Sequence, residues 1–120
     1  MIDHFEIKVV NFDTCMAFYT TVLKPLHIEL KWSDENGAGY GGMDTAKVAF
    51  VLEKSEQNTT CHIAFSASCQ DAVNAFHKDG LEYGYRDNGR PGLREDYAPN
   101  YYAAFLLDPD GNNVEAVVYT

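Results

Sequence analysis

The stretch TCHIAF at residues 60–65 shows how this chain is organised. It reads as a short strand, and its pattern repeats that of MIDHFEI at residues 1–7. When the chain is shifted against itself so that His4 lies on His62, further identical residues coincide: Asp13 with Asp71, Ala17 with Ala75, Phe18 with Phe76, and Leu23 with Leu81. The chain therefore contains two copies of one unit, each with a histidine at the same point.

The first copy reads as a strand, a helix and three more strands. Residues 2–10 alternate between polar and apolar side chains, which places His4 on the face away from the apolar layer. An amphipathic helix follows, with Asn11 and Asp13 as candidate caps and Pro25 as its stop. The expected strands after it are His27–Trp32, the glycine-rich Gly37–Gly42 and Lys47–Glu53.

The second copy follows a polar linker at residues 55–59 and has the same order. Strand alternation turns His62 away from the apolar face, and Glu115 lies on the equivalent polar side of the last strand. The expected elements are a helix from Asp71 to Gly80, strands at 82–86, 100–107 and 113–119, a loop at 87–92 and a type I turn at 108–111. We predict one α+β domain over residues 1–120, with module one at about 1–54 and module two at about 60–120.

Composition narrows the classes of partner. The chain has 9 basic and 18 acidic residues and a formal charge of −9, which repels phosphate backbones and anionic lipid surfaces. We therefore expect neither nucleic-acid nor membrane binding. The sequence shows no signal peptide and no apolar run of membrane-spanning length. Its three cysteines form no disulfide pattern, so we expect a cytoplasmic protein.

Four motifs in this order resemble the vicinal-oxygen-chelate superfamily, the glyoxalase, bleomycin-resistance and extradiol-dioxygenase group. The motifs are Ile2-Asp3-His4, Ala17-Phe18-Tyr19, HIAF at 62–65 and DPDGNNVE at 108–115. The resemblance covers essentially the whole chain. It implies paired βαβββ modules whose curled mixed sheets surround a cavity, a bound divalent metal ion and commonly a homodimer. It does not imply a reaction, because this fold hosts several chemistries.

The resemblance gives His4, His62 and Glu115 the role of metal ligands. Two histidines and one carboxylate with open coordination positions can hold iron and other divalent ions, so the expected cofactor is one Zn, Ni, Mn or Fe ion. In the alternative, His4 is a surface residue and His62 a satisfied core residue. A fourth ligand position of the family falls on Phe50, which cannot bind a metal, and Glu53 faces the other side. This favours the fosfomycin-modifying and extradiol types over glyoxalase I.

The arginines of the chain lie close together in the second module. Arg86, Arg90 and Arg94 fall within nine positions of an otherwise acidic chain. Because guanidinium groups bind carboxylate or phosphate through two parallel hydrogen bonds, Arg90 and Arg94 are candidates for binding an anionic substrate. In the alternative, the arginines form surface ion pairs with Glu95 and Asp96.

An aromatic segment follows the arginines. Asn100, Tyr101 and Tyr102 open the next-to-last strand, which in the resemblance lines the cavity, and Tyr97 precedes it. We assign Asn100 to substrate binding, and Tyr101 or Tyr102 to proton transfer or hydrogen bonding. Only one of these two tyrosines can face the cavity, since neighbours on a strand point to opposite faces. Packing in the core is the alternative role for both.

Three functions follow from these residues. The first is a small metal-dependent lyase, isomerase or transferase, in which the cation acts as a Lewis acid on an oxygen-bearing small molecule. The second is an extradiol-type dioxygenase with iron and a tyrosine as its acid–base group. The third is a binding protein that sequesters a drug or metabolite without turning it over.

Overall fold

Two copies of a βαβββ unit make up the fold. The computed structural model describes residues 2–120, so Met1 lies outside the described part of module one. The elements are β1 (Phe5–Val9), α1 (Phe12–Val22), a 3-10 turn η1 (Lys24–Leu26), β2 (Ile28–Ser33), β3 (Gly37–Gly42), β4 (Phe50–Lys54), β5 (His62–Ser66), α2 (Gln70–Glu82), β6 (Arg86–Leu93), β7 (Tyr101–Leu107) and β8 (Asn113–Tyr119).

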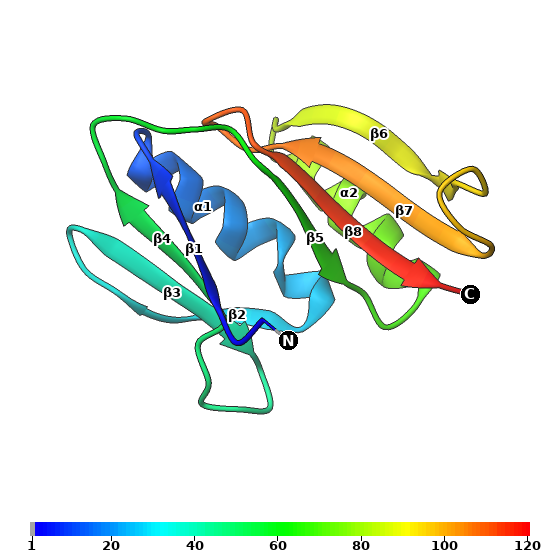
Figure 1. The fold of residues 1–120 in the computed structure, drawn as a ribbon, viewed down its shortest axis with the longest axis horizontal. Coiled ribbons are helices and arrows are strands. Elements are labelled where there is room, and N and C mark those ends of the chain that lie inside the picture. The colour runs from blue at the N-terminus through cyan, green and yellow to red at the C-terminus, as the bar shows by residue number, and fades with distance from the viewer. Residues whose placement is uncertain (1) are drawn as a thin grey trace.

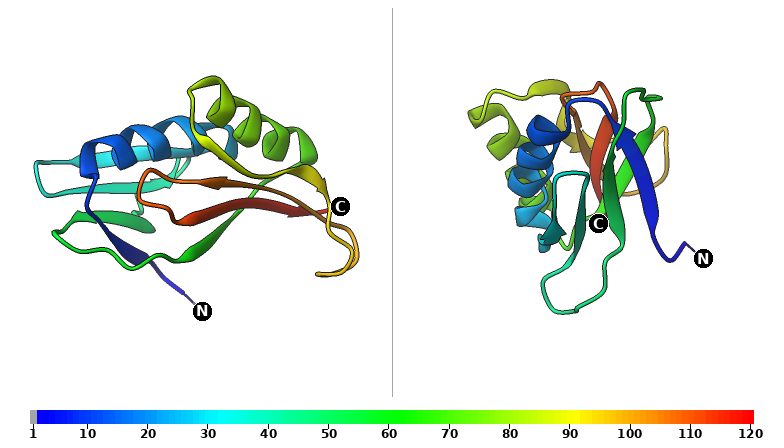
Figure 2. Two further views of the ribbon diagram at one scale, coloured as in Figure 1. Left: turned by 90° about the horizontal axis from the view of Figure 1, so that it is seen from above. Right: turned by 90° about the vertical axis from the view of Figure 1, so that its left-hand side faces the viewer.

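Each copy forms its own four-stranded mixed sheet. The strand orders are β1-β4-β3-β2 and β5-β8-β7-β6, with one parallel pair in each sheet, β1 with β4 and β5 with β8. The two sheets lie side by side with β1 and β5 next to one another, and both helices cover the same side of them (Figures 1 and 2). The predicted α+β fold of two βαβββ modules is confirmed.

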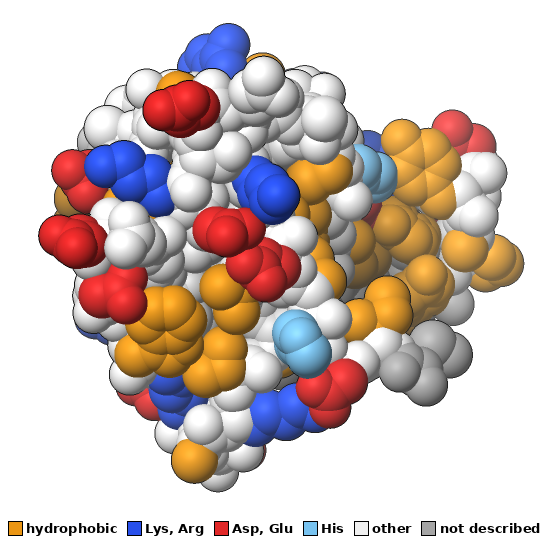
Figure 3. Space-filling model, turned by 60° about the vertical axis from the view of Figure 1, so that its left-hand side comes forward, with side chains coloured by type: hydrophobic (Ala, Val, Ile, Leu, Met, Phe, Trp, Pro, Cys, Tyr) orange, Lys and Arg blue, Asp and Glu red, His pale blue; other side chains and the backbone are white. Residues whose placement is uncertain are grey.

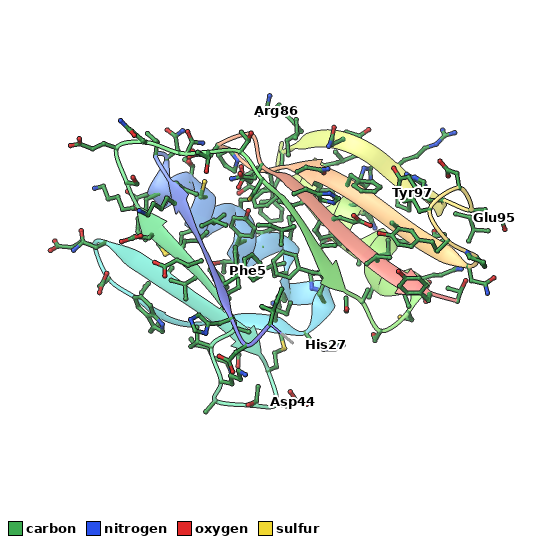
Figure 4. All side chains as sticks on the ribbon, viewed as in Figure 1. Phe5, His27, Asp44, Arg86, Glu95 and Tyr97 are labelled. Carbon is green, nitrogen blue, oxygen red and sulfur yellow. The ribbon has the colours of Figure 1, made fainter. Side chains whose placement is uncertain are left out.

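The core lies between the helices and the sheets. On α1 and just beyond it, Cys15, Phe18, Tyr19, Val22 and Leu23 are fully buried, and their i, i+3, i+4, i+7, i+8 spacing is that of the apolar face of an amphipathic helix. Phe5 lies between the two sheets in the middle of the molecule (Figure 4), and its ring centre is 6.4 Å from that of Phe65. No helix within residues 2–120 has the length and apolar character needed to cross a membrane.

The β7–β8 turn joins module two to module one. Asp108 is fully buried and accepts a 2.7 Å hydrogen bond from the Tyr19 hydroxyl of α1. Asp110 accepts hydrogen bonds from the backbone N–H groups of Val10 (2.6 Å) and Asn11 (3.0 Å). Burial by itself raises the pKa of Asp110, but these hydrogen bonds outweigh it and hold the pKa below its ordinary value. The expected turn therefore also fixes the relative position of the modules.

The structure corrects the elements expected at residues 71–92. Helix α2 continues past Gly80 to Glu82, and the first glycine after the helix, Gly84, has a positive φ of 85°. The segment that composition predicts to be a loop is strand β6, which starts at Arg86 and carries two register shifts against β7. An edge strand tolerates Pro91 and irregular glycines, because one side of its backbone needs no ladder partner.

Candidate functional site

A buried carboxylate lies on the second sheet, on the face turned away from α2. Glu115 of β8 is 1% exposed, and its neighbours in register are Ala64 of β5 and Phe105 of β7. Its Oε1 atom lies 2.7 Å from Nε2 of His62, and its Oε2 atom accepts a hydrogen bond from the Tyr101 hydroxyl. We call His62, Tyr101 and Glu115 the Glu115 site.

Strand pairing brings these three side chains together. His62 pairs with Asn113, two positions before Glu115 in β8, so His62 and Glu115 lie on the same face. Tyr101 and Phe105 share that face of β7, with the small Ala103 between them. The small side chain leaves room for the Tyr101 ring to extend along the strand toward the carboxylate.

The hydrogen bond from Tyr101 has a fixed direction. Burial, and then the hydrogen bond to Glu115, raise the pKa of the Tyr101 phenol well above its ordinary value. The phenol therefore keeps its proton at neutral pH and acts as a donor to the carboxylate. At the open end of the same face, the Tyr101 ring packs edge-on against Tyr97 and Tyr119, with ring centres 5.4 Å and 5.2 Å away.

His4 does not join the other two predicted ligands within one chain. Its side chain is 60% exposed, and its Nδ1 atom lies 2.8 Å from a carboxylate oxygen of Asp3. Within residues 2–120, no group of three or more His, Cys, Asp or Glu side chains could hold a metal ion. Within one chain, His4 therefore lies apart from His62 and Glu115, because His4 precedes β1 and β1 belongs to the other sheet.

His62 also lines an open groove between the two sheets. The groove has a volume of about 420 Å³ and runs between β1 and β5, with Phe5, Ile7 and Ile63 on its walls. In the space-filling view of Figure 3, hydrophobic side chains border a hollow on the right-hand side of the molecule. His62 is thus the residue of the Glu115 site that borders this groove, while Glu115 itself is buried.

The strand register corrects the position expected for a fourth ligand. Phe5 pairs with Phe50 in the first sheet as Ile63 pairs with Val114 in the second. The module-one counterpart of Glu115 is therefore Val51, one residue beyond the expected Phe50. Phe50 itself is buried in the core. Neither side chain can bind a metal, so module one supplies no carboxylate at this position.

The candidate residues around β7 divide between the two faces of the sheet. Tyr102 points toward α2, where its hydroxyl donates a 2.6 Å hydrogen bond to Asn74. Asn100 has a left-handed backbone conformation (φ 65°), and its carbonyl accepts a hydrogen bond from the Thr120 N–H. Tyr101 is thus the tyrosine on the Glu115 face, Tyr102 is on the helix face, and Asn100 shapes the turn before β7.

Of the candidate arginines, Arg94 lies closest to the site. Its guanidinium carbon is 5.4 Å from the ring centre of Phe105, and that ring centre is 6.3 Å from the centre of the His62 ring. Arg90 is exposed, and its carbonyl accepts a 2.7 Å hydrogen bond from Nη2 of Arg94. The loop that holds Glu95 and Tyr97 lies at the end of the second sheet (Figure 4).

Sequence reasoning missed Phe105 as a site residue. Its ring packs against the guanidinium group of Arg94 and the imidazole ring of His62. Phe105 is 7% exposed. The signal was present in the strand alternation, because Phe105 shares the parity of Tyr101 on the same strand. From sequence alone, however, an apolar aromatic residue in a strand is assigned to the core. Only the strand register shows that Phe105 pairs with Glu115.

Comparisons with known proteins bear on the fold. The sequence matches no protein-family model and no curated protein. Among solved structures, it is similar to a glyoxalase/bleomycin resistance protein from Albidiferax ferrireducens, with 25% identity, 96% of each chain covered and a TM-score of 0.81. The chain has the fold of the vicinal-oxygen-chelate superfamily. The resemblance predicted from the four motifs is thereby confirmed.

Two further vicinal-oxygen-chelate structures share the fold at lower identity. One is a glyoxalase/bleomycin resistance protein/dioxygenase family enzyme from Burkholderia phytofirmans, with 16% identity, coverage of 99% and 98%, and a TM-score of 0.74. The other is a lactoylglutathione lyase from Agrobacterium tumefaciens, with 16% identity, coverage of 98% and 92%, and a TM-score of 0.72. Since their names differ in chemistry, the fold alone does not select a reaction.

Proposed function

We propose that this vicinal-oxygen-chelate chain is a metal-dependent enzyme that binds one divalent cation through His62 and Glu115. The cation would act as a Lewis acid on an oxygen-bearing small molecule, in a lyase, isomerase or transferase reaction. The observation that carries the proposal is the buried carboxylate of Glu115, with an imidazole nitrogen 2.7 Å from one of its oxygens. A cytoplasmic location, expected from the three free cysteines, belongs to the same proposal.

The burial of Glu115 needs a reason. Removing an ionised carboxylate from water costs several kcal/mol unless positive charge or hydrogen bonds compensate. Among residues 2–120, the ion pairs of Glu115 include no lysine or arginine, and its partners are a half-exposed histidine and a neutral phenol. A bound cation would supply the missing positive charge.

The donor atoms fit a divalent ion in type and in spacing. Imidazole nitrogen and carboxylate oxygen both bind zinc, manganese and iron. Two ligand atoms at bond lengths of about 2.0–2.2 Å around one ion lie roughly 3 Å apart. Nε2 of His62 and Oε1 of Glu115, at 2.7 Å, need only a small outward shift to admit an ion between them.

Two protein ligands are few for a stable site, and we propose His4 of a second copy as the third. A two-fold dimer repeats each contact, so a first module placed over the Glu115 site of its partner would complete both sites at once. His4 is exposed and precedes the strand at the edge of its sheet, which leaves it accessible to a second chain. The proposed active form is accordingly a homodimer.

The side chains of this chain would prepare the site for the substrate. A cation held by His62 and Glu115 would supply Lewis-acid chemistry, which polarises a substrate oxygen and stabilises negative charge on it. Tyr101 keeps its proton and holds Oε2 of Glu115, which orients the carboxylate and leaves Oε1 beside His62. The rings of Phe105 and Tyr101 limit the access of water to the carboxylate, and exclusion of water strengthens electrostatic interactions there.

Metal analysis of untagged protein tests the proposal. We expect about one equivalent of Zn, Ni, Mn or Fe in the parent after incubation with these ions, and loss of that metal in Glu115→Gln and His62→Ala. Glu53→Gln, on the same face of β4 as Val51 in module one, is the matched control and should keep its metal. A parent that takes up no ion would overturn the proposal and favour a sequestering protein.

A mixing experiment tests the dimeric ligand set. His4→Ala and His62→Ala should each lose the metal when expressed alone. Co-expression should restore roughly a quarter of the parent's metal per chain, because about half of the dimers are mixed and each mixed dimer keeps one intact site. Ligands taken from a single chain cannot complement in this way, so zero recovery rejects His4 of a second copy as a ligand.

A further inference from the structure

We infer that Arg94 is an anion anchor and that the molecule bound at the Glu115 site carries a carboxylate or phosphoryl group. The inference deepens the proposed function, on which it rests for the reacting end of the substrate. The evidence for the anion site itself comes from the contacts of Arg94 and does not depend on the proposed metal.

Arg94 is held in place at several points. Its backbone N–H donates a 2.7 Å hydrogen bond to the carbonyl of Tyr101, and its own carbonyl accepts one from the Tyr97 N–H. Its Nη2 atom donates to the carbonyl of Arg90, and its guanidinium plane lies over Phe105. Much of the conformational entropy that a free arginine loses on binding is therefore lost already, which favours binding of a ligand.

The guanidinium has donors left for a ligand. Of its five N–H groups, one is used on the Arg90 carbonyl. None of the ion pairs within residues 2–120 involves Arg94, although Glu95 and Asp96 follow it in the sequence. The structure therefore does not contain the alternative, in which the arginines form ion pairs with these two acidic residues. A half-buried arginine without a carboxylate partner is unusual in a chain with twice as many acidic as basic residues.

The irregular strand β6 makes the space for this arrangement. Gly89 pairs with Phe105, and a Cβ at Gly89 would lie only 2.8 Å from the Phe105 ring. Gly92 pairs with Ala103, and a Cβ at Gly92 would lie 3.1 Å from Nη1 of Arg94. The two glycines therefore let β6 approach the ring and leave room for the guanidinium beside it.

The location defines the class of ligand. Arg94 and His62 lie against the same Phe105 ring, so a small molecule that reaches His62 and Glu115 with one end can present its other end to Arg94. Arginine binds planar carboxylates and tetrahedral phosphoryl groups through paired N–H donors. In a chain of net charge −9, such a local cation is also what an anionic substrate requires.

NMR titration of metal-free protein labelled with 15N tests this inference. Inorganic phosphate and acetate are added in separate arms at constant ionic strength. The backbone amide signals around residue 94 are followed in every variant, and the Nε–Hε signal of Arg94 is followed as well wherever that arginine is present. We expect a saturable shift in at least one arm, and the arm that saturates at lower concentration identifies the phosphoryl or the carboxylate class. Arg94→Lys should weaken that binding about tenfold, because lysine lacks the two-pronged donor set, and Arg90→Lys should leave it unchanged.

Two further measurements keep the result decisive. Gly92→Ala retains every charge but crowds Nη1, so it should weaken anion binding while the amide spectrum stays that of a folded protein. Shifts that never saturate, or that are equal in Arg94→Lys and Arg90→Lys, overturn the inference. Metal content measured on the same proteins separates the two proposals: Arg94→Lys should keep the metal, and a parent that binds anions but no metal rejects only the proposed function.

Discussion

The two modules share one topology but differ in two regions, the connection between their last two strands and the face turned away from the helix. In module one, the β3–β4 connection at residues 43–49 is an exposed loop that projects from the molecule, with Asp44 at its tip (Figures 1 and 4). In module two, the β7–β8 connection is a short turn whose Asp108 and Asn112 are buried. The same connection is thus exposed to solvent in module one, whereas in module two it forms the junction between the two modules.

The outer faces differ in chemistry. The second sheet has Glu115 where the first has Val51, as the parallel registers of β4 and β8 establish. In the first sheet, the glycine-rich strand β3 leaves space that the Trp32 side chain fills, and a Cβ at Gly39 would lie 2.1 Å from its indole nitrogen. The repeat therefore supplies one scaffold twice, and only the second copy carries the polar site.

The largest effect is expected when the junction is broken. Asp108→Ala removes the acceptor of the Tyr19 hydroxyl, of the Asn112 side-chain amide and of two backbone N–H groups. Because buried donors left without partners cost about 1–3 kcal/mol each, we expect a loss of roughly 3 kcal/mol or more in the free energy of unfolding. Urea denaturation followed by circular dichroism measures it.

The control for this change is the helix contact of module two. His77 occupies the position equivalent to Tyr19 and pairs with Asp87 at 2.8 Å, but the Asp87 side chain is 54% exposed. Water can replace this partner, so Asp87→Ala should cost about 1 kcal/mol or less. Equal losses of unfolding free energy in the two variants would show that the Asp108 contacts between the modules are no stronger than the His77–Asp87 contact within module two.

A smaller effect, dependent on pH, is expected at Asp110. Its folded pKa lies below the unfolded value of about 3.9, so its contribution to stability is complete above pH 4 and is lost as the pH falls through the folded pKa. Asp110→Asn should therefore lower the free energy of unfolding by about 1 kcal/mol at pH 6, after allowance for solvent screening. The difference should shrink below pH 4.

The module-one loop provides the control for Asp110. Asp44→Asn changes an exposed carboxylate in the equivalent connection and should shift stability by less than about 0.5 kcal/mol across the same pH range. Urea curves at several pH values measure both variants. A deficit of Asp110→Asn that does not vary between pH 6 and pH 3 would contradict the assigned role of its charge.

The smallest change in stability is expected where the outer faces differ. Glu115→Val places the module-one residue in the second sheet, and it removes a buried charge rather than a packing contact. Removing one member of an ion pair is costly when the other stays buried, but the His62 side chain is 55% exposed and water can solvate it. Metal-free protein should therefore change by about 1 kcal/mol or less, toward higher stability, because a buried carboxylate is removed. A loss above roughly 2 kcal/mol, seen in urea with a chelator present, would make Glu115 a structural residue.

Local patterns predicted most of the scaffold. Alternation and helical spacing identified both helices, and the β8 strand was placed at its observed bounds, Asn113–Tyr119. They also put His62 and Glu115 on the face away from the helices, because side-chain direction in a strand follows from parity alone. Glycine and proline at residues 87–92 led to the wrong prediction of a loop, since an edge strand can hold residues that a central strand excludes.

What the sequence by itself determined is therefore the repeat, the fold class and the face on which each strand residue lies, because these depend on interactions within a few residues. Only the tertiary structure decided which faces meet. Strand register, set by pairing between distant segments, made Val51 rather than Phe50 the counterpart of Glu115. It also set Phe105 beside Glu115, and the side-by-side placement of the sheets kept His4 away from His62.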